Sequence, residues 1–179
     1  LRFVSGVLRV ITMLERVGDY AETISRASLQ LTEPPPARIA QDMEMLLRHV
    51  SKNLEQSMRA FLEEDEDLAR GTLSSAKQYL PTFDKVYTDL VKEGEDKTRP
   101  VIELFSLLAI FNRLERVLHH SKNICEQAIF VVAGETKVSK HFNIVFFDDQ
   151  NDGPSQFAEH YARKAYPSGG TFRSAAWGD

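Results

Sequence analysis

Three acidic residues near the start of the sequence have a spacing that suits cation binding. Glu15, Asp19 and Glu22 are separated by four and then three positions, so a helix through them would carry their carboxylates on one face. Oxygens at this spacing could converge on a hard or borderline metal ion, whose charge would relieve their mutual repulsion. The same spacing also fits a solvated acidic face with Glu15 paired to a neighbouring arginine, and on spacing alone this is the more common case.

The motif around Glu15 recurs later in the sequence at a fixed offset. The four residues at 14–17 are repeated, with identical side-chain types, at 114–117. In the second copy His119 stands where the first copy has Asp19. A neutral imidazole still binds transition metals, so this change either tunes the metal or marks a decayed site. Two related helices at one spacing indicate a duplicated helical unit, whose first copy is expected to be incomplete here.

Hydrophobic periodicity predicts the helices that would position these residues. Apolar side chains recur at steps of three and four, the period of a helix packed on one face. The expected helices cover about residues 1–28, 37–64, 66–90 and 100–134. Asp65 is a candidate N-cap of the third helix, and Pro81 is expected to kink or break it because proline removes a helical hydrogen bond. Gly134 is a natural stop for the fourth helix.

The sequence changes character after Gly134. Residues 142–147 form a continuous apolar run typical of a fully buried strand, and a turn-rich segment follows. Ser155 is a candidate cap for the next helix, and residues 171–177 are a second candidate strand. A strand, a helix and a strand in this order indicate a right-handed crossover unit.

The predicted fold class is mainly α. We expect an antiparallel helical bundle over residues 1–134 and a short C-terminal β-α-β appendage within residues 135–179. About forty residues cannot bury both faces of a parallel sheet. The appendage is therefore expected to pack on the bundle, to pair with another chain, or to be unfolded.

Composition excludes several classes of function. The chain has 179 residues, of which 42% are hydrophobic and 27% are charged, and it has one cysteine, Cys125. One cysteine cannot form an intrachain disulfide or a CxxC metal knuckle, so a reducing, cytoplasmic compartment is expected. The net charge is -4 with dispersed bases, so no nucleic-acid partner is expected. No apolar run reaches about 18 residues, so we expect a protein that is peripheral to a membrane at most.

The repeated segments resemble a known family. Residues 14–24 read LERVGDYAETI and residues 114–124 read LERVLHHSKNI. Both resemble a helix that recurs in the PhoU family of phosphate-uptake regulators, which has the form L-E-R-I-x-D-x-x-x-N-I. Residues 60–69, AFLEEDEDLA, are similar to that family's link between the first two helices of a repeat. The resemblance covers about residues 1–134 and implies parts of two three-helix repeats, without the first two helices of the amino-terminal repeat.

The PhoU resemblance also implies metal ligands at the matching positions. The implied ligands lie in both copies of the motif and on the third predicted helix: Glu15, Asp19, Glu115, His119, Asn123 and Asp84, with Glu22 on the same face as the first pair. The metal would be iron, manganese or zinc. Thr23 replaces the asparagine of the family pattern, His120 is expected at the surface, and Cys125 is expected in the core.

The segment after the bundle resembles a second family. Residues 155–159 read SQFAE and residues 172–176 read FRSAA, similar to the opening of the low-molecular-weight phosphatase and arsenate-reductase family. The loop of that family binds an oxyanion on backbone amides while a cysteine thiolate attacks. Here Asp148 stands at the nucleophile position and Pro154 at the arginine position. Negative charge and the missing guanidinium predict a truncated, degenerate module without catalysis.

The leading hypothesis is a non-enzymatic PhoU-like regulator of phosphate uptake and phosphate signalling. The resemblance implies partners in the phosphate ABC-transporter ATPase and a sensor histidine kinase, reached through helix faces, and an exposed apolar stripe predicts a homodimer. The alternative is an arsenate-reductase- or phosphatase-related protein with an inactive anion loop, serving an arsenic or phosphate oxyanion response. A carboxylate-bridged metal oxidase is disfavoured, because Glu115 and His119 are one residue too far apart for its Glu-x-x-His pair.

Overall fold

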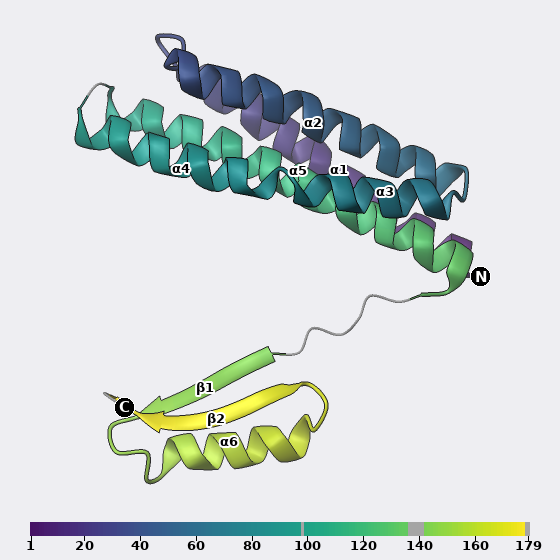
Figure 1. Cartoon of the computed structure of the whole chain (residues 1–179), viewed down its shortest axis with the longest axis vertical. Helices are drawn as coiled ribbons and strands as arrows, with labels where there is room; N and C mark the ends of the chain where they lie inside the picture. Colours follow the sequence, from purple (N-terminus) through teal and green to yellow (C-terminus); the bar gives the residue numbers. More distant parts are fainter. Residues whose placement is uncertain (98, 136–141, 178–179) are drawn as a thin grey trace. The chain divides into compact units, whose positions relative to one another are not determined.

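The computed structural model describes residues 1–97, 99–135 and 142–177. The chain divides into two compact units, Leu1–Thr136 and Lys137–Asp179. The first is a helical bundle and the second contains two strands and a helix (Figure 1). Within the described ranges, no helix is both long enough and apolar enough to cross a bilayer.

The helical unit is built around its longest helix. Its elements are α1 (Arg2–Ser28), α2 (Ala37–Leu62), α3 (Glu66–Lys77), α4 (Leu80–Glu95) and α5 (Val101–Ala133). α5 packs against all four other helices, whereas α1 packs extensively only against α5. Leu107, Ile110 and Leu118 of α5 are almost fully buried. α5 is therefore the core of the unit and α1 lies at its margin.

Local sequence signals explain most of the helix ends. The Asp65 carboxylate accepts a hydrogen bond from the Leu68 amide at 2.8 Å, which confirms the predicted cap of α3. The helix is interrupted between α3 and α4, and Pro81 lies in the first turn of α4. Proline is tolerated there because a backbone N–H in the first turn has no partner within the helix. Gly134 ends α5 with a φ of 75°, in the left-handed region that favours glycine. The predicted third helix is thus two helices.

The apolar residues of α1 lie on two different faces. Gly6 and Val10 are buried against the bundle, but Val4, Leu8 and Ile11 are 59%, 64% and 57% exposed. A 3–4 spacing shows that a face is apolar and does not show what covers it. Tyr87 of α4 is likewise 58% exposed, although it continues the 3–4 spacing of the buried Phe83 and Leu90.

The second unit is the predicted strand-helix-strand arrangement. Strand β1 (Phe142–Asp148) pairs in parallel with β2 (Gly170–Ala176), and α6 (Pro154–Ala165) connects them. Within this unit the two strands contact each other, and α6 packs against both of them. The prediction that β1 is fully buried is wrong, because most of its residues are exposed. A two-stranded sheet with one helix cannot cover both of its faces.

Candidate functional site

The two copies of the repeated motif face each other. α1 and α5 run antiparallel, because Thr32, just beyond the end of α1, bonds Glu103 near the start of α5, while Arg9 bonds Gln127 near its end. Tyr20 and His120 occupy equivalent positions in the two copies. The Tyr20 hydroxyl lies 3.4 Å from Nε2 of His120, so the related segments meet at their centres.

Tyr20 lies between two nitrogen-bearing side chains of α5. Its ring centroid is 5.6 Å from that of His120 and 5.6 Å from Cζ of Arg113. Within the part of the chain that is described, Nδ1 of His120 and Nε of Arg113 are buried without hydrogen-bond partners. Burial, followed by the positive charges of Arg16, His119 and Arg116, lowers the pKa of His120. His120 is therefore half-buried, rather than fully exposed as predicted.

A groove of about 390 Å³ runs along this contact between α1 and α5. Its lining combines basic, polar and apolar side chains: Leu8, Arg9, Thr12, Met13, Arg16, His120 and Asn123. Asn123, an implied metal ligand, therefore lies among cationic side chains. Such surroundings suit a negatively charged group better than a metal ion.

The acidic residues of the first copy lie on the open side of α1. Glu15, Asp19 and Glu22 are all exposed. Glu22 forms an ion pair with Arg26 at 2.6 Å. Their common face is the one that the spacing predicted, and it continues the exposed stripe of Val4, Leu8 and Ile11.

Two of the remaining implied ligands are brought together between α4 and α5. Asp84 and Glu115 both line a cavity of about 140 Å³, whose wall also includes Tyr87 and Asn112. His119 is partly buried and close enough to His120 to affect its protonation.

The described residues do not assemble these groups into a metal centre. Across residues 1–97, 99–135 and 142–177, no three or more His, Cys, Asp or Glu side chains are placed to hold one ion. The described residues therefore present no ready-made set of ligands for the implied metal. Metal binding by these residues stays a prediction.

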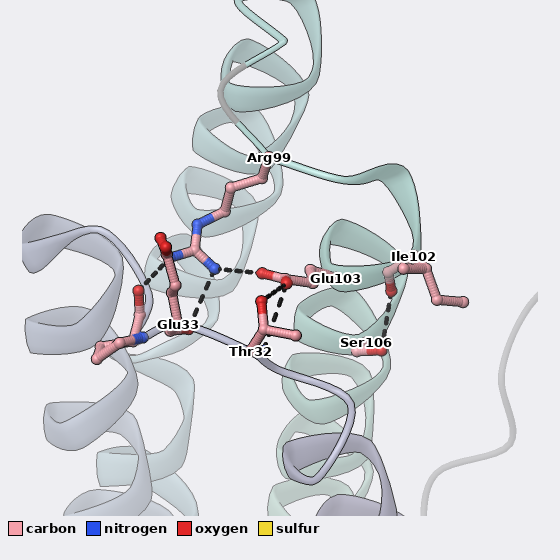
Figure 2. Close-up of polar contacts among 7 residues, drawn as sticks. Thr32, Glu33, Arg99, Ile102, Glu103 and Ser106 are labelled. Carbon is pink, nitrogen blue, oxygen red and sulfur yellow. Dashed lines mark hydrogen bonds and ion pairs between the residues drawn. The ribbon is translucent and has the colours of Figure 1, made fainter.

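One buried polar cluster was missed entirely by the sequence analysis (Figure 2). Glu103 of α5 has a side chain only 3% exposed, and it forms an ion pair with Arg99 at 2.7 Å. Glu103 also accepts a hydrogen bond of 2.5 Å from the Thr32 hydroxyl. Arg99 donates to the carbonyl oxygens of Glu33 and Pro34 as well. The cluster ties the loop after α1 to the start of α5, and the hydrogen bonds from Thr32 lower the pKa of Glu103.

In the loop after β1, a carboxylate accepts hydrogen bonds from the backbone amides of the same loop. Asp148 accepts hydrogen bonds from the amides of Gln150 at 3.2 Å, Ser155 at 3.0 Å and Asn151. These bonds, above all those of Ser155, lower the pKa of Asp148. Ser155 does not cap α6 as predicted, because the helix begins at Pro154 and the Ser155 hydroxyl donates to Asn151 instead. The loop amides that an oxyanion would need are thus already bonded within the chain.

Comparison with known proteins identifies the family likeness of the helical unit. A PhoU domain model matches residues 43–128. The phosphate-specific transport system accessory protein PhoU homolog of Xylella fastidiosa strain Temecula1 is 25% identical over 135 residues, which are 75% of this chain and 56% of that protein. The helical unit is PhoU-like.

Two further comparisons extend the PhoU likeness. The PhoU homolog of Pseudomonas putida is 30% identical over 142 residues, covering 75% of this chain and 53% of that protein. The crystal structure of the phosphate transport system regulatory protein PhoU from Streptococcus pneumoniae has a TM-score of 0.70 at 24% identity, covering 77% of this chain and 65% of that one. The bundle therefore has a PhoU fold, and the chain spans a little over half the length of its curated relatives. The arsenate-reductase-like resemblance of the second unit stays a prediction.

Proposed function

We propose that the helical unit is a non-enzymatic regulatory accessory protein of phosphate transport that acts through protein contacts. Support comes from the relatives, which are named as accessory proteins of the phosphate-specific transport system. Support also comes from α1, which leaves much of its surface uncovered because it packs extensively only on α5. The proposed partners are the ATPase of the phosphate importer and, secondarily, the phosphate sensor kinase.

The observation that carries the proposal is the exposed apolar stripe of Val4, Leu8 and Ile11 on α1. Its equivalents in the second copy are Leu104, Leu108 and Phe111 of α5. Leu104 and Leu108 pack against the main hydrophobic core, of which Phe111 is part. Among the described residues, equivalent positions of the two copies are therefore packed on α5 and exposed on α1.

Charge adds direction to the proposed docking face. Glu15, Asp19 and Glu22 continue the apolar stripe toward the other end of α1 and are exposed. A partner helix that covered the whole face would need apolar residues at 3–4 spacing followed by basic residues. Burying each of the three apolar side chains would contribute about 1.5–3 kcal/mol before the costs of association.

Binding of purified partners tests this proposal. The chain is titrated against the importer ATPase and the cytosolic part of the sensor kinase from its own organism, using biolayer interferometry. Leu8→Asp places a charge in the stripe, and Phe105→Asp is the matched control because Phe105 of α5 is 63% exposed against 64% for Leu8. We expect the ATPase affinity to fall at least about tenfold in the first variant only.

Two other results would count against the proposal. Equal affinity in Leu8→Asp and the unmodified chain would exclude α1 as the docking face. Absence of binding to both the ATPase and the kinase would overturn the regulatory function itself. Circular dichroism of each variant separates lost binding from lost folding.

Metal binding is a separate proposal with its own test. Elemental analysis after dialysis against a weak chelator compares the unmodified chain with a Glu15→Ala, Asp19→Ala variant. Stoichiometric iron, manganese or zinc that is lost in the variant would support a metal role for the first copy. No metal in either sample would leave the acidic face of α1 as a protein-docking surface.

A further inference from the structure

The groove between α1 and α5 has the features of an anion site. Among the residues that the structure describes, none of those lining it carries a carboxylate, although the whole chain has a net charge of -4. Arg9 and Arg16 enter it from α1, and His120 and Asn123 from α5. The groove is therefore positively charged, although the protein as a whole is negatively charged.

The donors in this groove differ in how far they are already bonded. Arg9 is held at one end by a 3.5 Å hydrogen bond to Gln127 and by the Phe130 ring at 6.0 Å. Arg16 and Asn123 make no hydrogen bond or ion pair with any residue in the described ranges. Two unbonded donor groups of different helices therefore line the same groove.

His120 lies in the same groove and has no acidic partner there. In the described part of the chain its Nδ1 atom is buried without a hydrogen-bond partner, and its Nε2 atom lies 3.4 Å from the Tyr20 hydroxyl. An anion in the groove would neutralise the repulsion between Arg9 and Arg16 and would offer acceptors to the unbonded donors of Arg16 and Asn123.

We propose that the α1–α5 groove binds a phosphoryl-type oxyanion, held by the Arg16 guanidinium together with the Asn123 amide. The planar guanidinium presents paired N–H donors that match two oxygens of a tetrahedral anion. The apolar side of the groove, Leu8 and Met13, leaves room beside the anion for a small organic group. Inorganic phosphate and a phosphate monoester share this chemistry, and the experiment separates them.

This inference does not depend on the proposed docking of transport proteins. The test uses the purified chain with no partner present, and its variants leave the stripe residues Val4, Leu8 and Ile11 unchanged. Isothermal titration calorimetry follows the binding of inorganic phosphate, of glycerol phosphate and of chloride at matched ionic strength. Arg16→Gln removes the proposed donor, and Arg26→Gln removes the same charge from another exposed site on α1, where Arg26 pairs with Glu22.

The expected result is saturable phosphate or monoester binding that Arg16→Gln weakens at least about tenfold and Arg26→Gln changes less than about twofold. In nuclear magnetic resonance spectra, the side-chain signals of Arg16 and Asn123 are expected to shift on titration. Tighter binding of the monoester would identify an organic phosphate as the ligand, and tighter binding of phosphate would identify the free ion.

Three results would overturn the proposal. These are no heat at millimolar concentrations of either phosphate, equal weakening by the two arginine variants, or equal competition by chloride. If no small anion binds but Arg16→Gln weakens binding of the importer ATPase, the groove instead contacts an acidic side chain of a partner.

Discussion

Replacing two glycines of α1 by alanine is expected to change stability in opposite directions. A Cβ at Gly6 would lie 3.0 Å from Cγ2 of Val131 and 3.1 Å from the Phe61 ring, whereas one at Gly18 would meet nothing within 4 Å. Both changes gain about 1 kcal/mol from helix propensity. Overpacking at Gly6 costs about 1–3 kcal/mol, because buried neighbours must move. Gly18→Ala should therefore stabilise by about 1 kcal/mol, and Gly6→Ala should destabilise by up to about 2 kcal/mol.

Urea unfolding followed by far-ultraviolet circular dichroism measures both effects, because the signal is dominated by helices. The difference between the two variants isolates the packing cost, since the propensity gain is common to both. If Gly6→Ala stabilised the protein as much as Gly18→Ala, the close approach of α1 to Phe61 and Val131 would be refuted. That result would also refute the orientation of α1 that leaves Val4, Leu8 and Ile11 exposed.

Three other perturbations test the polar and buried groups, and a fourth measurement tests assembly. Folding lowers the pKa of Glu103 below 4.5, so its pairing stabilises the protein fully above pH 4.5 and is lost as the pH falls through the lowered pKa. Glu103→Gln should therefore lower Tm at neutral pH, and the difference in Tm between variant and unmodified chain should narrow in acid. A difference in Tm that is independent of pH would contradict this. Burial raises the pKa of Cys125 to about 12, so the native thiol should not react with Ellman's reagent at mildly alkaline pH and should react fully once unfolded. Asp148→Ala should speed hydrogen exchange at the Ser155 amide, whereas Asp149→Ala, at an exposed position, should not. Equal exchange rates in the two variants would show that Asp148 does not hold this amide. The exposed stripe of α1 predicts a homodimer in sedimentation at micromolar concentration, and a monomer would count against self-association through it.

Helix positions and ends followed closely from local features. The predicted first, second and fourth helices agree with α1, α2 and α5 to within a few residues. The Asp65 cap and the Gly134 stop depend on side-chain and backbone preferences of one or two residues, which act wherever that segment folds. Pro81 was correctly expected to interrupt its helix.

The candidate site was less predictable. Glu15 and Asp19 do share a face of α1, but spacing on one helix could not supply further ligands from another. Glu103 gave no signal in the sequence, because a single glutamate in the first turn of a helix is ordinary and its partners come from distant loops. Asn123 matched a metal-binding pattern, and the structure places it beside Arg9 and Arg16.

By itself, the sequence determined the helices, the repeated motif and the PhoU likeness, because these depend on periodicity and on short segments of side chains. Only the tertiary structure decided which of two apolar faces of α1 is covered, and that Tyr20 meets His120 across the antiparallel pair. Both depend on which surfaces of distant segments fit together, and a local pattern of apolar residues is compatible with several such arrangements.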